Sequence, residues 1–272
     1  MAVYDCFAFN DDLIQLDIRL HELSDVVDKF VIVECNKTYR GKDKPLYFNE
    51  NKHLFKDHLD QIVHVVVTDA PEVNIEGRKK ERQFCNFSIE VHQANCIMRG
   101  LEGCKDDDII LLSGSDEIPR SEIVKEIVFK GLEFYTCMQG MYQYFLNTRF
   151  EELWPGTIIV KYLLLNWKKP NRIYKRHRTK SIKIDNGGWH FSRLVGNRAD
   201  ATDRIQNYLR NQSHYEIDTD EISNKEFLDN RIKELKGYHP YNNFNVAMTM
   251  EDMSKLPKYV QENPDKFKEY LR

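Results

Sequence analysis

The stretch "DDDIILLSGSDEIPR", residues 106–120, shows most directly how this chain folds. Three aspartates precede an apolar run of strand length, which stops at Ser113-Gly114-Ser115 and is followed by Asp116 and Glu117. A continuous apolar run is typical of a strand buried on both faces, as in a parallel sheet covered by helices. The sequence therefore predicts a buried strand with two carboxylates just after its carboxyl end.

Three other short apolar runs predict the neighbouring strands: "CFAF" at 6–9, "KFVIVE" at 29–34 and "IVHVVV" at 62–67. After the first run, Asp11 and Asp12 can cap a helix, because leucines recur at helical spacing from 13 to 23. Residues 84–101 predict another helix. Strands that alternate with helices imply an α/β fold with a largely parallel central sheet flanked by helices.

The second half of the chain differs in composition. Residues 134–150 and 156–165 are rich in aromatic residues and residues of high β propensity, which predicts strands with an antiparallel tendency. Residues 225–238 predict a polar helix. Because no linker rich in Pro, Gly or Ser separates the two halves, we predict a single domain over residues 1–272.

Composition excludes several classes of protein. With 272 residues, 41% of them hydrophobic, the chain can bury a sizeable core, and a net charge of −3 argues against nucleic acid as a partner. No apolar run approaches the about 20 residues needed for a membrane span, and no signal peptide is recognisable. The six cysteines include no C-x-x-C pair, so buried thiols are expected rather than a zinc site or disulfides. We expect a cytoplasmic protein, whose oligomeric state the sequence leaves open.

The acidic residues after the strand allow two interpretations. In open α/β sheets, ligands bind at the carboxyl ends of the strands, where Asp116 and Glu117 can hold a hard divalent cation that bridges phosphate oxygens. Alternatively, both residues cap a helix predicted over 118–128, with Pro119 in its first turn. Their spacing leaves both interpretations open. Residues 106–108 lie at the opposite end of the strand and predict a solvated turn.

Several blocks together resemble glycosyltransferase family 17. They are "YDCFAFN" at 4–10, the segment 18–48, "DDDIILLSGSDEIPR" at 106–120 and "GGWHFS" at 187–192. The likeness extends from Tyr4 to about Tyr238. It implies a GT-A-type, Rossmann-like fold, a nucleotide-sugar donor that is UDP-linked in the best known members, and transfer with inversion. The donor-binding half is then expected at about 1–120 and the acceptor-binding half at about 121–272.

Two departures from the family pattern fall in the expected donor site. Members typically read S-D-x-D-E-I-P after the strand, whereas this chain has Gly114 in place of the first aspartate of the D-x-D element. In the preceding helix the family usually has E-x-x-Q-R-N, and this chain has Ala94 in place of the arginine. A divalent cation, Mn²⁺ or Mg²⁺, is implied by the resemblance, but Gly114 removes one of its expected ligands.

The resemblance assigns roles to the matching residues. Donor binding is expected of Phe7, Asp12, Glu90, Gln93, Asn95, Ser115, Asp116 and Arg176; acceptor binding of Tyr144, Trp154 and Trp189; catalysis of Glu117, Glu216 and His190; metal binding of Asp116 and His214. The aromatic residues could equally pack in the core. A pair such as His214 and Glu216 could serve only as a hydrogen-bonded pair at a helix end.

Two short motifs supply chemistry of their own. The basic run "RIYKRHRTK" at 172–180 can bind a departing diphosphate through arginine forks, or can form a charged edge strand that discourages aggregation. In "GGWHFS", Gly187 and Gly188 permit close approach of the backbone to a ligand, Trp189 offers a flat face to a sugar ring, and His190 can donate or ligate.

An inverting transfer needs a base to deprotonate the acceptor hydroxyl. Glu117 and Glu216 are the candidates, with Glu151 and Glu152 behind them. The predicted function is therefore transfer of GlcNAc, or another hexose or pentose, from a nucleotide sugar to a glycan or glycoconjugate. Because of Gly114 and Ala94, a relative that binds sugar nucleotides or glycans without catalysis stays the alternative.

Overall fold

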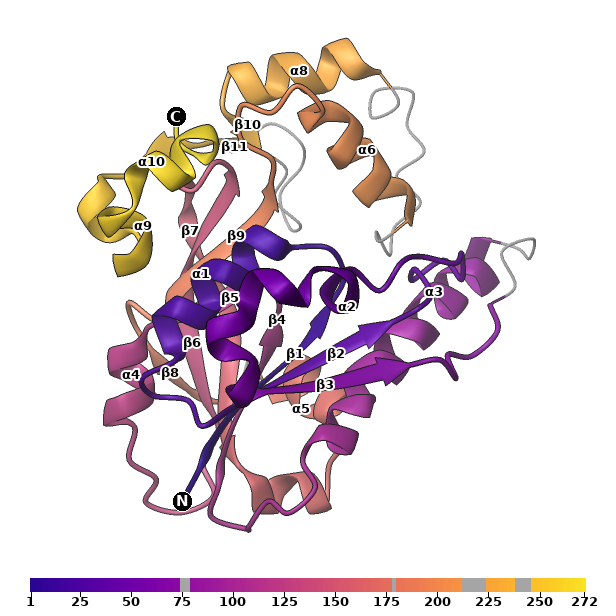
Figure 1. Cartoon of the computed structure of the whole chain (residues 1–272), viewed down its shortest axis with the longest axis vertical. Helices are drawn as coiled ribbons and strands as arrows, with labels where there is room; N and C mark the ends of the chain where they lie inside the picture. The colour runs from indigo at the N-terminus through magenta and orange to yellow at the C-terminus, as the bar shows by residue number, and fades with distance from the viewer. Residues whose placement is uncertain (74–78, 178–179, 212–223, 238–245) are drawn as a thin grey trace.

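The structure, a computed structural model, describes residues 1–73, 79–177, 180–211, 224–237 and 246–272, without the side chains of 79–86, 176–177 and 210–211. Figure 1 shows a central sheet with helices on both sides. None of the helices in the described ranges is long and apolar enough to cross a bilayer.

The first half of the chain forms the parallel part of the sheet. Its strands are β1 (Val3–Phe9), β2 (Lys29–Cys35), β3 (Ile62–Val67) and β4 (Ile109–Gly114), in the order β3-β2-β1-β4. Along β2, Val31 and Val33 join one apolar cluster while Phe30 and Ile32 join another. The strand is therefore buried on both faces, which is why its sequence reads as an uninterrupted apolar run.

Helices cover the two faces of this half. They are α1 (Leu13–Leu23), α2 (Tyr47–Asn51) with a 3₁₀ segment (Lys52–Gln61), and α3 (Lys79–Asn95) with a 3₁₀ segment (Cys96–Gly100). Leu16, Leu20 and Leu23 of α1 pack in the cluster that contains Phe30, and Ile89 of α3 packs in the one that contains Val31. The predicted α/β class is confirmed, and so are the four strands and both helices of this half.

The second half continues the sheet with antiparallel and parallel pairings. The strands are β5 (Glu117–Pro119), β6 (Tyr135–Tyr144), β7 (Thr148–Lys161), β8 (Ile182–Ile184), β9 (Gly188–Leu194) and β12 (Thr249–Met250). The long strand β7 runs antiparallel to both β4 and β6, while β9 runs parallel to β6. A separate small sheet pairs β10 (Lys236–Gly237) with β11 (Val246–Ala247). The sheet as a whole is mostly parallel, as predicted, and the division into donor and acceptor halves stays a prediction.

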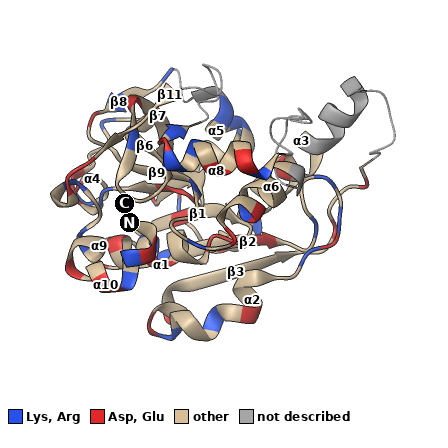
Figure 2. Ribbon diagram, turned by 90° about the horizontal axis from the view of Figure 1, so that it is seen from above, with Lys and Arg blue, Asp and Glu red and all other residues tan. Residues whose placement is uncertain are grey.

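The remaining helices surround this second half. They are α4 (Ser121–Glu126), α5 (Pro170–His177), α6 (Ala201–Asn211), α8 (Lys225–Lys233), α9 (Lys258–Glu262) and α10 (Pro264–Phe267), with 3₁₀ segments at Tyr162–Asn166, Met253–Lys255 and Lys268–Tyr270. Basic and acidic segments alternate along α9 and α10 in Figure 2. The charges of these helices therefore form no single-sign surface.

Local predictions for three segments differ in part from the structure. The basic run was expected as a strand or loop, but residues 170–177 form α5, in which Ile173 is buried and Tyr174 half-buried while Arg172 and Lys175 are exposed. The helix after β4 begins at Ser121, and Glu117 does not cap it because residues 117–119 pair with β9 instead. Within residues 106–108 only the first two are exposed: Asp108 is buried and accepts from the backbone amides of Ala2 and Lys105.

Candidate functional site

The turn after β4 is held in place by the buried side chain of Arg19 in α1. Its guanidinium forms a two-point ion pair with Asp5 of β1, with both bonds at 2.6 Å. It also donates to the backbone carbonyls of Gly114 at 2.9 Å and Glu117 at 3.0 Å. Both charged side chains are fully buried. A charged pair inside the fold thus fixes the backbone at the carboxyl end of β4.

Asp12 joins this turn from the connection between β1 and α1. Ser115 Oγ donates to Asp12 Oδ2 at 2.9 Å. The pKa of Asp12 is raised to about 8, because burial and the nearby charges of Asp11 and Asp116 disfavour its ionised form. The hydrogen bond from Ser115 and the charge of Arg204 offset this only in part. Burial and the two neighbouring carboxylates therefore disfavour the ionised form of Asp12, and added positive charge would favour it.

His190 of β9 lies on the other side of Asp116. Its Nε2 is 3.1 Å from Asp116 Oδ2, and its ring centroid is 4.9 Å from that of Trp154. His190 Nδ1 is buried without a hydrogen-bond partner among the described residues. A Cβ atom at Gly114 would lie 2.7 Å from Asp116 Oδ1. Asp116 is thus oriented by His190 and occupies the space next to Gly114, where a larger side chain would have to displace it.

Glu117 points into a network of donors. Its carboxylate accepts from Trp154 Nε1 at 2.6 Å, from the hydroxyl of Tyr174 at 2.8 Å and from the backbone amide of Gly114 at 2.9 Å. The residue is only 2% exposed. These bonds connect β5, β7 and α5 through one carboxylate. Glu117 therefore has a positioning role in this structure, whether or not it also acts as a base.

The motif at 187–192 serves packing more than ligand contact. A Cβ at Gly187 would lie 2.6 Å from the backbone nitrogen of Met138, and one at Gly188 would lie 2.1 Å from the carbonyl oxygen of Ile118. The two glycines thus allow neighbouring segments to approach each other closely. Trp189 is 1% exposed, with the guanidinium of Arg120 4.2 Å from its ring. Its position does not support sugar stacking, because its ring belongs to the core.

The α3 residues of the donor prediction make connections within the fold. Gln93 is fully buried and its amide donates to the carbonyls of Phe9 and Val33, at the ends of β1 and β2. Asn95 accepts from the backbone amide of Asn171 in α5. Glu90 pairs with Lys175 of α5 at 3.0 Å. These contacts join α3 to α5 and to the strands β1 and β2.

The other predicted residues are dispersed. Phe7 and Tyr144 are buried in separate apolar clusters. Trp154 is half-buried beside His190, so it is the predicted acceptor residue that the structure brings to the acidic cluster. Exposed positions of β7 hold Glu151 and Glu152. His214, Glu216 and the side chain of Arg176 lie outside the described residues.

Four residues of the site escaped the sequence analysis: Arg19, Tyr174, Arg204 and Tyr208. The first had a signal, since a charged residue interrupts the leucine face of α1. The last two lie one turn apart on the exposed side of α6. The charge of Arg204 lowers the pKa of Asp12, while Asp116 and Asp12 add to the burial that raises the pKa of Tyr208. Figure 1 shows α6 beyond the carboxyl ends of β1 and β2. A guanidinium and an aromatic residue from a distant part of the chain are therefore near enough to the acidic cluster to interact with it electrostatically.

Known proteins similar to this chain are found at the level of both sequence and structure. Residues 1–272 match the profile of glycosyltransferase family 17. The curated relatives include the beta-1,4-mannosyl-glycoprotein 4-beta-N-acetylglucosaminyltransferases of Rattus norvegicus and Homo sapiens, each 28% identical over 119 residues. That match covers 43% of this chain but only 21% and 22% of theirs, so the chain spans about a fifth of these relatives. A crystal structure of an active-site mutant of LgtC is 10% identical, with a TM-score of 0.35 over 92% of this chain and 87% of that chain.

Proposed function

Because the chain belongs to glycosyltransferase family 17, we propose that it is an inverting glycosyltransferase. Its donor is a nucleotide sugar, UDP-linked, that carries GlcNAc or another hexose or pentose, and its acceptor is a glycan or glycoconjugate. The observation that carries this proposal is the cluster of Asp12, Ser115 and Asp116 at the carboxyl ends of β1 and β4. Ligands of open α/β sheets bind at that edge.

The cluster fits a divalent cation. Asp12 and Asp116 offer the oxygen ligands that Mn²⁺ and Mg²⁺ prefer, and a cation would offset the burial and the neighbouring carboxylates that raise the pKa of Asp12. A bound cation would supply charge neutralisation for the departing diphosphate. Asp12 could take the place of the aspartate that Gly114 replaces, so metal binding would draw its ligands from two strands instead of one.

The residues around the cluster suit a sugar donor and acceptor. Arg204 and Tyr208 of α6 lie within electrostatic reach of the acids, where a guanidinium can bind phosphate and an aromatic ring can pack on a base or sugar. Trp154, whose ring lies beside that of His190, is proposed for the acceptor side. The Glu117 carboxylate accepts a hydrogen bond from the indole nitrogen of Trp154. The base is therefore proposed among Glu117 and Glu216, with Glu151 and Glu152 as further candidates. Base catalysis contributes roughly 10²- to 10⁴-fold.

A second candidate function is binding without catalysis. Gly114 and Ala94, which replace one carboxylate and one guanidinium of the family pattern, favour it. The enzyme and a relative that binds sugar nucleotides both predict nucleotide binding, a relative that binds glycans does not, and turnover of the donor is expected only of the enzyme. A cytoplasmic location stays part of the proposal, and it agrees with the five free cysteines among the described residues.

A donor screen distinguishes these functions. The purified chain is incubated with UDP-sugars and GDP-sugars, with Mn²⁺, with Mg²⁺ or with EDTA, and released nucleoside diphosphate is measured. We expect slow hydrolysis of one UDP-sugar, a rise in melting temperature with UDP, and loss of both in Asp116→Asn. Melting shifts without hydrolysis or transfer would support the binding protein. If no nucleotide shifts melting under any metal condition, the enzyme and the donor-site assignment are refuted, and only a glycan-binding relative is left.

A further inference from the structure

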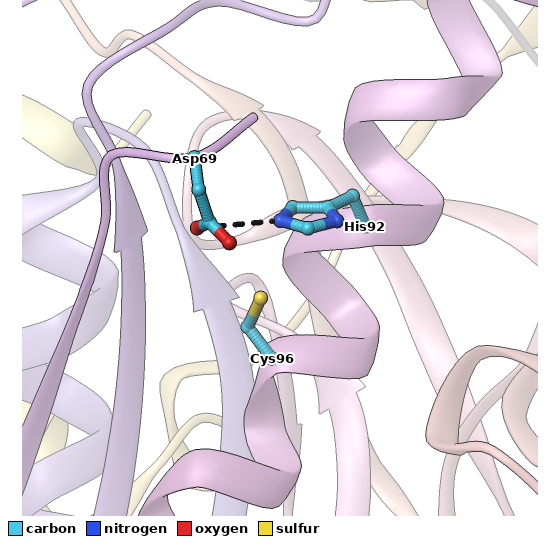
Figure 3. Close-up of side chains that lie close together, drawn as sticks. All are labelled: Asp69, His92 and Cys96. Carbon is cyan, nitrogen blue, oxygen red and sulfur yellow. Dashed lines mark ion pairs between the residues drawn. The ribbon is translucent and has the colours of Figure 1, made fainter. Parts of the chain in front are cut away.

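A second group of potential metal ligands lies at the edge strand of the parallel sheet, apart from the acidic cluster. Asp69 follows β3, while His92 and Cys96 lie one helical turn apart on α3 and its 3₁₀ extension. Figure 3 shows all three side chains pointing toward one another. One ligand atom from each lies within 4.8 Å of the others. Among the residues that the structure describes, these three form the one group of potential metal ligands whose ligand atoms lie this close together.

The spacing of these atoms approaches that of a tetrahedral metal site. Zn²⁺ binds sulfur at about 2.3 Å and nitrogen or oxygen at about 2.0–2.2 Å, so ligand atoms around it are about 3.3–3.7 Å apart. His92 Nε2 is 3.5 Å from Asp69 Oδ1, which is already in this range and long for a hydrogen bond. That nitrogen is buried and has no hydrogen-bond partner among the described residues. A side-chain rotation at Cys96 would complete the arrangement.

The surroundings prepare each ligand. Arg99 donates to both oxygens of Asp69, at 2.9 and 2.7 Å. These bonds hold the pKa of the Asp69 carboxyl well below its usual range, so it is ionised and oriented. Cys96 is only 4% exposed, so its thiol is shielded from solvent beside the other two ligands.

We propose that Asp69, His92 and Cys96 bind one borderline transition-metal cation such as Zn²⁺, with water as the fourth ligand. A set of one sulfur, one nitrogen and one oxygen selects such a cation over Mg²⁺ and Mn²⁺, which prefer oxygen. Binding forms a metal–sulfur bond and releases the thiol proton to solvent, one proton per ion. The cation would tie α3 to the end of β3. A zinc site was not expected from the sequence because the chain has no C-x-x-C pair. A mixed site with a single cysteine ligand needs no such pair, so that expectation does not apply to it.

Cobalt is the probe for the test. The full chain is stripped with EDTA and titrated with Co²⁺, and its absorption spectrum is recorded before and after addition of Zn²⁺. We expect a thiolate-to-cobalt charge-transfer band that saturates at one ion per chain, that Zn²⁺ abolishes, and whose appearance releases one proton. Cys96→Ala should remove the band, while Cys104→Ala, a matched change at a half-buried thiol elsewhere, should keep it. Asp116→Asn should also keep it, which separates this site from the donor site.

His92→Ala is a second variant for the case that Cys96→Ala, which changes a buried residue, does not fold. The His92 side chain is 30% exposed, so its removal should disturb the fold less. Changes outside the ligand shell alone weaken metal binding roughly 10- to 100-fold, so loss of this ligand should cost at least as much in affinity. Absence of the charge-transfer band, its survival in Cys96→Ala, or unchanged affinity in a folded His92→Ala protein would each overturn the proposal. None of these outcomes depends on donor turnover.

Discussion

Replacement of Arg19 by methionine tests whether one buried ion pair holds the donor-site turn. In Arg19→Met the Asp5 carboxylate loses both 2.6 Å bonds while it stays fully buried. Breaking a buried pair in this way costs about 3–5 kcal/mol. The carbonyls of Gly114 and Glu117 lose a donor as well, and their costs overlap with that of the pair. We expect a loss of about 4 kcal/mol in the free energy of unfolding.

Urea denaturation followed by circular dichroism measures this loss, and the melting temperature should fall by about 10 °C for a chain of this size. Lys37→Met is the control, because its pair with Asp43 is exposed and such pairs contribute only about 0–1 kcal/mol. The double variant Asp5→Leu/Arg19→Met should regain most of the loss, since apolar pairs often replace buried ion pairs without cost. The double variant should still bind UDP poorly, because the turn remains without its anchor.

The reasoning is refuted if the free energies of unfolding of Arg19→Met and Lys37→Met differ by less than about 1 kcal/mol, because exposed ion pairs contribute about 0–1 kcal/mol. That result would mean that strand pairing alone holds the turn. Normal UDP binding in the double variant would likewise show that Arg19 does not position the donor site.

Three other predictions concern single residues. Because the pKa of Asp12 is raised to about 8 from 3.8, the folded chain keeps a proton between these values, so the free energy of unfolding should fall as pH rises through this window. Asp12→Asn should abolish that fall, and urea midpoints from pH 4.5 to 8.5 measure it. Gly114→Asp should displace Asp116 and make UDP binding more dependent on Mn²⁺, whereas calorimetry showing strict dependence unchanged by the variant would contradict this. Trp189→Ala should cost about 3–5 kcal/mol in stability, and acceptor use lost with stability unchanged would reassign the ring to the acceptor site.

Local patterns in the sequence were sufficient for the strands and helices of the first half. In β2 and β4 the apolar runs correspond to strands buried on both faces, and in α1 the leucines at helical spacing pack together against the sheet. Such patterns extend over only a few neighbouring residues, so they predict burial without knowledge of the tertiary structure. The same holds for the acidic turn at residues 115–117, which follows directly from where β4 stops.

The prediction failed where distant contacts compete with local propensity. Residues 117–119 could begin a helix by their own sequence, but pairing with β9 makes them a strand. Trp189 offers a flat ring in isolation, yet packing around it and the bond from its indole nitrogen to the Lys255 carbonyl place it in the core. A pattern within a few residues gives no information about contacts with residues far away in the sequence.

The sequence by itself determined the α/β class, the family and an acidic strand end. Only the tertiary structure decided which groups meet there: Arg19 with Asp5, Asp12 with Ser115, and His190 with Asp116. It likewise decided that Asp69 would face His92 and Cys96. The physical reason is that periodicity reports burial along one element, whereas sites form between side chains from different elements. Their proximity depends on how the whole sheet orders its strands.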